Sequence, residues 1–271
     1  MRTVAIIQAR MGSSRLPGKV LQTIGGKPML AWVIERACRA KTLDEVVLAT
    51  TDHPSDDPVA AFCAAQGYTY TRGSQFDVLD RYYQAAKQHS ADIVVRVTGD
   101  CPFVDPVLID QTVTHLLTEK LDFAANRLPP PWGRTYPIGL DVEVVTMAKL
   151  ETAWRMTTEK HHREHVMPFF YEDADPDDLQ AHPNSTQSGF TITPKNYRVG
   201  LLHHTPDHGH MRWTVDTPED LELARTIATH FPDDTFPWQD VVALFEQYPK
   251  LANVNAHIQH RTAQDVDERT R

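Results

Sequence analysis

The chain alternates short apolar segments rich in β-branched residues with segments whose apolar residues recur at helical spacing. Strands that are separated by helices lie parallel in one sheet, because each right-handed crossover returns the chain to the same end of the sheet. The alternation therefore predicts an α/β fold with a mostly parallel sheet flanked by helices. The first predicted strands are Thr3–Gln8, Glu45–Thr50 and Asp92–Val97, and the first predicted helices are Pro28–Ala40, Pro58–Gln66 and Val78–His89.

The pattern is less regular in the rest of the chain. Three consecutive prolines in Leu128–Trp132 predict a loop, since proline continues neither a helix nor a central strand. Thr217 precedes Pro218 and two acidic residues, which is the pattern of a helix N-terminus. The other predicted elements are a helix from Pro106 to about Thr118, a strand over Gly139–Thr146, one or two helices within Ala148–Tyr171 that break near His161–Arg163, a surface loop over Asp173–Gly189, a strand over Met211–Val215, a helix over Trp238–Tyr248 and a frayed tail from Ala263.

The composition excludes several classes of protein. With 271 residues, of which 41% are hydrophobic, the chain can bury one large core, or a core with an appendage. The net charge of −9 provides no overall positive field that would attract the protein to nucleic acid or to an anionic membrane. The cysteines Cys38, Cys63 and Cys101 form no CxxC pair, and no segment has the pattern of a signal peptide or a membrane span. We therefore expect a cytoplasmic protein.

The loop after the first predicted strand combines glycine, serine and cationic side chains. At the carboxyl edge of a parallel sheet, such a loop can surround a polyphosphate with backbone N–H groups and positive charge. It matches neither the GxGxxG pattern of dinucleotide sites nor the GxxxxGK[ST] phosphate loop. A solvated basic loop that uses glycine only for turning is the alternative. The residues that carry the pattern are Arg10, Gly12, Ser13, Ser14, Arg15, Gly18 and Lys19.

Two aspartates follow predicted strands that are far apart in the sequence. Asp100 comes directly after an apolar segment, and Asp216 stands between Val215 and the helix that Thr217 begins. Carboxylates at the ends of strands, next to a polyphosphate loop, can hold Mg²⁺ while phosphates and water fill its other positions. We therefore predict that Asp100 and Asp216 share a magnesium ion. The alternative for Asp216 is a helix cap.

Five segments of the chain form a set of motifs: IIQARMGSSRLPGKVL, RGSQFDVLDRY, VVRVTGDCPFVDP, YPIGLDVEVV and WTVDTPEDLELA. Together they resemble the SpsF-type (spore coat polysaccharide biosynthesis F-type) cytidylyltransferases, which belong to the acylneuraminate and 3-deoxy-manno-octulosonate cytidylyltransferase superfamily. The resemblance covers most of residues 3–230. Its first motif is specific, because it combines Ala-Arg, Ser-x-Arg-Leu-Pro-x-Lys and Gly-Lys-Pro at fixed spacing.

The resemblance implies a GT-A-like Rossmannoid fold and a reaction. It implies a magnesium-dependent nucleotidyltransferase that moves CMP from CTP to an acidic sugar or a related acceptor and releases pyrophosphate, in the synthesis of surface polysaccharide or glycoconjugate precursors. Members of this superfamily commonly form dimers, so the resemblance also implies a homodimer. The predicted dimer contact is Asn126–Tyr171. On this basis, residues 1–235 form the nucleotidyltransferase domain, with a small dimerisation and acceptor insertion at about 126–171, and residues 236–271 form a C-terminal helix and tail.

The resemblance also implies roles for individual residues. Asp100 and Asp216 are the implied Mg²⁺ ligands, and Arg15 and Lys19 are the implied catalytic cations that stabilise charge on the α-phosphate and the leaving pyrophosphate. Gln8 replaces the proline that the sialic-acid and octulosonate enzymes have before Ala-Arg. The implied nucleotide-binding residues are Gln8, Ala9, Arg10, Gly12, Ser13, Arg15, Lys19, Arg72 and Asp77, and the implied acceptor-binding residues are Asp141, Glu143, Arg163 and His165.

Asp141 and Glu143 bear on the chemistry of the acceptor. They lie on the same side of the chain if their segment is a strand. Their charges would repel an acidic acceptor unless a metal ion or Arg134 intervenes, and this favours an acceptor with amino or hydroxyl groups. An exposed strand face is the alternative explanation for the pair.

Other functions stay open at this point. A nucleotidyltransferase that acts on a sugar phosphate or a phosphonate, with CTP or another nucleoside triphosphate, would use the same phosphate loop. A glycosyltransferase that consumes a nucleotide sugar and a non-catalytic nucleotide-binding protein are further alternatives. Two histidine-rich patches raise the question of zinc, but the absence of a cysteine pair and of an HExxH helix argues against it. The patches contain His161, His162 and His165, and then His203, His204, His208 and His210.

Overall fold

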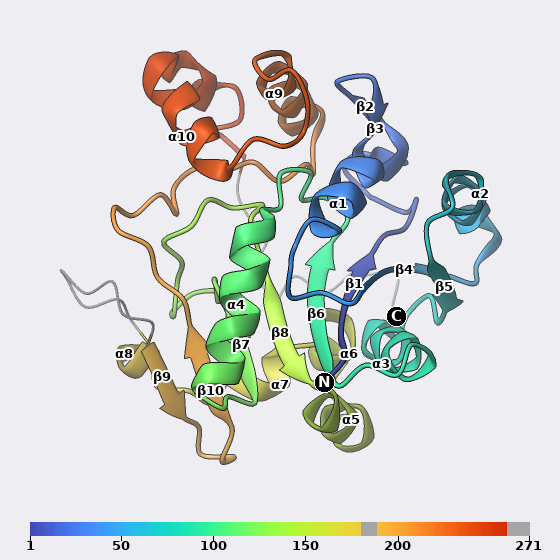
Figure 1. The fold of residues 1–271 in the computed structure, drawn as a ribbon, viewed down its shortest axis with the longest axis vertical. Helices are drawn as coiled ribbons and strands as arrows, with labels where there is room; N and C mark the ends of the chain where they lie inside the picture. Colours follow the sequence, from blue (N-terminus) through green and yellow to red (C-terminus); the bar gives the residue numbers. More distant parts are fainter. Residues whose placement is uncertain (180–188, 259–271) are drawn as a thin grey trace.

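The computed structural model describes residues 1–179 and 189–258. This part of the chain is built around one eight-stranded sheet with the strand order β5-β4-β1-β6-β8-β7-β10-β9 (Figure 1). A two-stranded ribbon of β2 and β3 forms a separate small sheet. The strands are β1 (Thr3–Gln8), β2 (Thr23–Ile24), β3 (Lys27–Pro28), β4 (Glu45–Thr51), β5 (Tyr70–Gly73), β6 (Ile93–Thr98), β7 (Phe123–Ala125), β8 (Glu143–Thr146), β9 (Gly189–Ile192) and β10 (Arg198–Leu201).

Most strands of the large sheet run in the same direction. β1 pairs in parallel with β4 and β6, β4 with β5, and β7 with β10. β8 is antiparallel to β6 and β7, and β9 is antiparallel to β10. The carboxyl ends of the other strands therefore share one edge of the sheet, which is uppermost in Figure 1. This confirms the predicted α/β fold with a mostly parallel sheet.

Side chains alternate between the two faces along each strand, so apolar side chains of the sheet lie on both faces. Helices cover both faces and bury these side chains. Ile7 of β1 belongs to a core layer with α1, α4, α9 and α10, whereas its neighbour Ile6 belongs to a layer with α3, α5 and α7. Among the described residues, none of the helices combines the length and the hydrophobicity needed to cross a bilayer. The helices are α1 (Met29–Ala37), α2 (Asp57–Gln66), α3 (Val78–Gln88), α4 (Pro106–Thr118), α5 (Met147–Met156), α6 (Lys160–His165), α7 (Pro168–Tyr171), α8 (Pro176–Leu179), α9 (Pro218–Thr229) and α10 (Trp238–Gln247), with short 3₁₀ turns at Lys19–Leu21, Pro54–Asp56 and Pro249–Asn253.

One predicted strand is wrong. Met211–Val215 has the composition of a strand, but only Arg212 makes an isolated bridge, to Ile138. The segment instead crosses the carboxyl end of the sheet, where the N–H of Val215 donates to the carbonyl of Asp100 over 2.9 Å. Gly139 makes this crossing possible, because a Cβ atom there would lie 2.5 Å from the backbone nitrogen of Thr214. An apolar segment that packs across strand ends has the same composition as a strand within the sheet.

The predicted break near His161–Arg163 is also wrong. The chain leaves its helical path earlier, after Met156, and α6 runs through the predicted break from Lys160 to His165. The strand predicted over Gly139–Thr146 is shorter and begins at Glu143. Within the loop predicted over Asp173–Gly189, the structure has α8, and residues 180–188 lie outside the described part of the chain. The predicted frayed tail lies outside it as well.

Candidate active site

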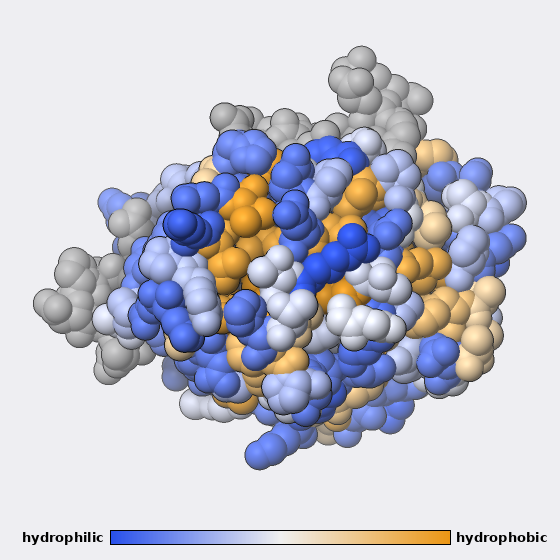
Figure 2. Space-filling model, turned by 90° about the horizontal axis from the view of Figure 1, so that it is seen from above, coloured by the Kyte–Doolittle hydropathy of each residue, from blue (hydrophilic) through white to orange (hydrophobic). Residues whose placement is uncertain are grey.

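A pocket of about 570 Å³ opens at the carboxyl edge of the sheet. Its walls come from the loop after β1, the end of β6, the chain before β8, the segment that crosses the strand ends, and α6. Seen from above, hydrophilic residues cover most of this end of the molecule, with hydrophobic residues visible between them (Figure 2). The volume lies in the range of small-molecule sites.

The loop after β1 is held in a fixed path by its own backbone. The carbonyl of Met11 accepts hydrogen bonds from the N–H groups of Ser13 and Gly18, both over 2.9 Å. Ser13 Oγ accepts from the N–H of Leu16 over 3.2 Å. Gly18 has a φ of 70°, a left-handed conformation that favours glycine, and the 3₁₀ turn of Lys19 follows directly. The loop therefore delivers Lys19 into the pocket wall.

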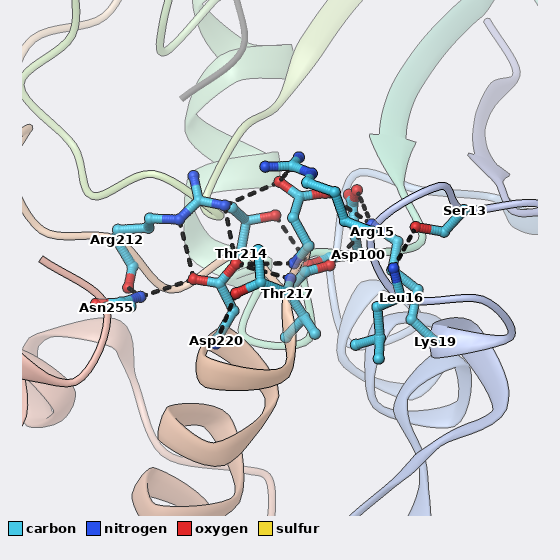
Figure 3. A network of polar contacts seen from close by, with 12 residues as sticks. Ser13, Arg15, Leu16, Lys19, Asp100, Arg212, Thr214, Thr217, Asp220 and Asn255 are labelled. Carbon is cyan, nitrogen blue, oxygen red and sulfur yellow. Dashed lines mark hydrogen bonds and ion pairs between the residues drawn. The ribbon is translucent and has the colours of Figure 1, made fainter. Parts of the chain in front are cut away.

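Lys19 joins the two predicted metal ligands. Its Nζ donates to Asp100 Oδ2 over 2.9 Å, to Asp216 Oδ1 over 2.8 Å and to the carbonyl of Val215 over 2.8 Å (Figure 3). Burial alone would lower the pKa of Lys19, but Asp100 and Asp216 outweigh burial and raise it. Lys19 is therefore a buried cation at neutral pH, and it contacts both of the aspartates that are predicted to share a metal ion.

Asp216 lies among three cations. Besides Lys19, Arg15 Nη2 is 3.0 Å and Arg212 Nη2 is 2.9 Å from Asp216 Oδ2. Burial would raise the pKa of Asp216, but Lys19 and then Arg15 and Arg212 hold it far below its ordinary value. The carboxylate is therefore ionised at neutral pH, which a ligand for a hard cation requires.

Asp100 is fixed from the end of β6. Thr98 Oγ1 donates to Asp100 Oδ1 over 2.6 Å, and the carbonyl of Asp100 accepts from Thr214 Oγ1 over 3.1 Å. The end of β6 and the crossing segment that carries Asp216 are therefore joined by hydrogen bonds as well as by Lys19.

The helix cap beside the site is Thr217. Its side chain and that of Asp220 form a reciprocal capping box at the start of α9, so the alternative that Asp216 is the cap is wrong. Asp220 also accepts from Arg212 Nε and Nη2, both over 3.0 Å, and from Asn255 Nδ2 over 2.8 Å. Asp220 thus holds Arg212 against Asp216.

Replacing Asp220 by asparagine will lower the free energy of unfolding by about 1.5–3 kcal/mol, because it removes one of the two carboxylates that pair with the buried Arg212 and leaves only Asp216. Burial would raise the pKa of Asp220, but Arg212 and Asn255 lower it, so its stabilisation is complete above about pH 4 and is lost as the pH falls further. Urea unfolding of the two proteins measures the difference, which we expect to shrink below about pH 4. Glu222→Gln, at an exposed position on α9, is the control and will change stability little; an equal loss in both variants would contradict the prediction.

In the same pocket wall, arginines pair with the predicted acceptor carboxylates. Asp141 Oδ1 lies 2.7 Å from Arg134 Nη1, and Asp141 Oδ2 lies 3.0 Å from Arg127 Nε. Glu143 forms an ion pair with Arg96. Glu143 is buried and Asp141 is mostly so, and both line the pocket, so the alternative of an exposed strand face is wrong. Three arginines therefore pair with these two carboxylates in the pocket wall.

The structure does not bring every predicted residue to the pocket wall. Gln8, Ala9, Arg10, Gly12 and Ser13 line it, as does His165. Arg72 instead binds Asp57 over 2.7 Å and the carbonyl of Thr51 over 2.8 Å. Asp77 caps α3 and lies 3.4 Å from Arg163 Nη1, which ties α3 to α6. The nucleotide role of Arg72 and Asp77 and the acceptor role of Arg163 stay predictions.

A strained turn aims His165 at the pocket. Val166 has a φ of 70° and a ψ of −54°, and the N–H of Met167 donates to the carbonyl of His165 over 2.8 Å. This is a γ-turn, which is rare for a residue with a branched side chain. Val166 is fully buried, and its packing holds the turn. The turn ends α6 so that Glu164 and His165 face the pocket.

Several functional arginines were not predicted from the sequence. Arg212 and Asp216 are four residues apart in the WTVDTPEDLELA region, and their spacing could have suggested an ion pair. Arg96 and Arg127 have no such signal, because the carboxylates that they bind are far away in the sequence.

The carboxyl edge of a mostly parallel sheet holds a basic glycine-containing loop against Asp100, which follows β6, and Asp216, which follows the crossing segment. This arrangement defines a nucleotidyltransferase of Rossmann-like fold. The family model for cytidylyltransferases matches residues 4–247. The chain belongs to the cytidylyltransferase family, as its motifs predict.

Individual relatives agree with this assignment. An uncharacterized protein of Methanocaldococcus jannaschii is 33% identical and covers 99% of this chain and 100% of its own length. The spore coat polysaccharide biosynthesis protein SpsF of Bacillus subtilis is 32% identical over 82% of this chain and 84% of its own. The 3-deoxy-manno-octulosonate cytidylyltransferase of Pelobacter propionicus is 40% identical, but over only 44% of this chain and 46% of its own. A solved cytidylyltransferase from Leptospira borgpetersenii has a TM-score of 0.82 and 29% identity, covering 96% of this chain and 100% of that one.

Proposed function

We propose that this cytidylyltransferase transfers CMP from CTP to a small acidic acceptor with the help of Mg²⁺ and releases pyrophosphate. The observation that carries the proposal is the contact of Lys19 with both Asp100 and Asp216 beside the loop after β1. This arrangement gives one pocket the cations for a triphosphate and the carboxylates for a hard metal ion.

The chemistry of Asp100 and Asp216 fits a magnesium ion. Both offer carboxylate oxygens, which Mg²⁺ prefers, and an oxygen of each lies within hydrogen-bond distance of the same ammonium group. The Lys19 ammonium thus marks a place between the two carboxylates where positive charge is stabilised. When bound, Mg²⁺ supplies charge neutralisation at the phosphate oxygens. Asp100 and Asp216 would hold it.

The loop after β1 would bind and orient the triphosphate. Arg15 and Lys19 place positive charge where the α-phosphate and the leaving pyrophosphate gain negative charge, which lowers the barrier without a covalent enzyme intermediate. Their positions are fixed before substrate binds, because each is already in an ion pair. Positioning and charge stabilisation would therefore supply most of the catalysis.

The three arginines that pair with Asp141 and Glu143 support an acidic acceptor. Unpaired carboxylates at Asp141 and Glu143 would favour an acceptor with amino or hydroxyl groups. In the structure, however, Asp141 pairs with Arg127 and Arg134, and Glu143 pairs with Arg96. An acceptor carboxylate would meet guanidinium groups there, which suit planar anions. A sugar phosphate or a phosphonate presents similar charge and is the second candidate. Similarity to SpsF supports a role in precursors of surface polysaccharide, and the homodimer and the cytoplasmic location stay predictions.

CTP-dependent release of pyrophosphate tests the proposal. Purified protein, CTP and Mg²⁺ would be incubated with keto-sugar acids, sugar phosphates and phosphonates, and UTP, GTP and ATP would replace CTP in parallel. We expect release that requires both CTP and an acidic acceptor. Binding of CTP without release for any acceptor would instead favour a non-catalytic nucleotide-binding protein.

Replacing Arg134 by glutamine will reduce kcat/KM for the acceptor about 10–100-fold, because a hydrogen bond to a charged group is worth about 1.5–3 kcal/mol. The KM for CTP will change little, since Arg134 is proposed to contact the acceptor and not the triphosphate. Steady-state kinetics with each substrate varied in turn makes the comparison. Arg225→Gln, at an exposed position on α9, is the matched control. A loss of equal size for CTP would place Arg134 at the nucleotide instead.

A further inference from the structure

The first histidine-rich patch gains a carboxylate in the folded chain. His161 and His162 lie side by side on α6, and Glu172 follows the end of α7. Glu172 Oε2 is 3.0 Å from His161 Nε2 and 2.7 Å from His162 Nε2. One ligand atom from each of these residues lies within 4.8 Å of the others, and no other such cluster of three occurs among residues 1–179 and 189–258.

A hydrogen bond between Nδ1 and Thr157 fixes the orientation of the His162 ring. Its Nδ1 is 2.7 Å from Thr157 Oγ1, and only 3% of the residue is exposed. When Nδ1 donates its hydrogen to this hydroxyl, Nε2 carries a lone pair and points at Glu172. A partner of this kind on the far nitrogen is what fixes the ring of a metal-binding histidine.

The contact between His162 and Glu172 lacks the geometry of a hydrogen bond. His162 Nε2 is buried and has no hydrogen-bond partner in the described chain, although Oε2 lies at 2.7 Å. Leaving a buried polar nitrogen without a hydrogen bond is costly, and a cation bound to both His162 Nε2 and Glu172 Oε2 would satisfy both atoms.

We propose that His161, His162 and Glu172 form a zinc site separate from the catalytic pocket. Two imidazoles and a carboxylate are a common ligand set for Zn²⁺, with water in the fourth position. Ligand atoms at about 2.0–2.2 Å from a tetrahedral zinc ion stand roughly 3.4 Å apart, so small side-chain rotations suffice to admit the ion. Lys195 lies 3.3 Å from the other oxygen, Glu172 Oε1, and is paired with Asp173 at 2.8 Å, which offsets its charge.

The site would fix one wall of the catalytic pocket. It joins α6 to the chain after α7, and α6 carries Glu164 and His165 to the pocket. The second histidine-rich patch has a different environment: the rings of His204 and His208 meet Trp238 edge-on, with ring centroids 4.9 Å and 5.8 Å away. His203 Nε2 is 2.7 Å from the carbonyl of Leu179. Among the described residues, none of these histidines belongs to a cluster of three potential metal ligands.

Zinc binding to the whole protein tests the proposal without reference to activity. Metal-free protein would be titrated with Zn²⁺ by calorimetry and with Co²⁺ by visible absorption, which reports a tetrahedral site. We expect one ion per chain, at least about 100-fold weaker binding in His162→Gln and Glu172→Gln, and about 10–100-fold weaker binding in Thr157→Val.

His208→Gln is the matched control and will leave zinc binding unchanged. Glu172 is partly exposed, so Glu172→Gln keeps the test valid if His162→Gln does not fold, and circular dichroism of the metal-free proteins checks this point. Equal zinc affinity in wild type, His162→Gln and Glu172→Gln would overturn the proposal, as would a loss confined to His208→Gln. No binding of zinc to the wild type would overturn it too.

Discussion

Asp100→Asn will reduce kcat for pyrophosphate release by about a thousandfold, because a metal ion at the phosphates supplies several kcal/mol of charge stabilisation. The fold will be retained, since asparagine has the same size and can still accept a hydrogen bond from Thr98. Steady-state rates over a range of Mg²⁺ concentrations measure the effect. We also expect the concentration of Mg²⁺ that gives half the maximal rate to rise.

An exposed aspartate provides the comparison for this variant. Asp240→Asn on α10 removes the same charge far from the pocket and will leave both kcat and the Mg²⁺ requirement unchanged. If Asp100→Asn kept its rate within a few fold of the wild type, Asp100 would not be a metal ligand. The proposed mechanism would then have to rely on Asp216 and the cations alone.

Lys19→Met will lower kcat by about 10²–10³-fold, the usual cost of losing one preorganised group that stabilises developing charge. Methionine keeps most of the length of the side chain and loses the ammonium that both aspartates contact. Lys19 is the main cause that lowers the pKa of Asp216, so its loss will raise that pKa. As the pH is lowered, Asp216 in the variant will be protonated at a higher pH than in the wild type. The acid limb of the pH profile of kcat will therefore move to higher pH.

Lys41→Met, at an exposed position, is the control for Lys19→Met and will behave as wild type. The affinity for CTP, measured by calorimetry, separates binding from turnover. A loss of CTP binding with an unchanged kcat at saturation would mean that Lys19 binds the ground state and the transition state equally well.

The long strands of the sheet were predictable, whereas among the short ones only β8 was. β1, β4 and β6 have six or seven residues, enough to show an apolar pattern bounded by loops. β5, β7, β9 and β10 have three or four residues each and show no periodicity of their own. Their place in the sheet follows from pairing with neighbours that are distant in the sequence, which a local pattern does not contain.

Lys19, Asp100 and Asp216 were more predictable as members of the site than the partners of Asp141 and Glu143. All three lie in motifs, and the two aspartates adjoin elements that the sequence indicates. The partners of Asp141 and Glu143 depend instead on how the chain around Arg127 and Arg134 folds over the sheet. For this reason the sequence left open whether Arg134 offsets the charge of Asp141, and the structure shows that Arg134 and Arg127 both pair with it.

Asn255 supports the candidate active site although it lies beyond the part of the chain that matches the family model. The match to the cytidylyltransferase family ends at residue 247, but Asn255 is buried and donates to the carbonyl of Arg212 over 3.1 Å as well as to Asp220. Through these two residues, the segment after α10 supports the carboxylate of Asp216. A chain shortened at the family boundary would keep every residue that is proposed to touch substrate and would still lose part of what holds them in place.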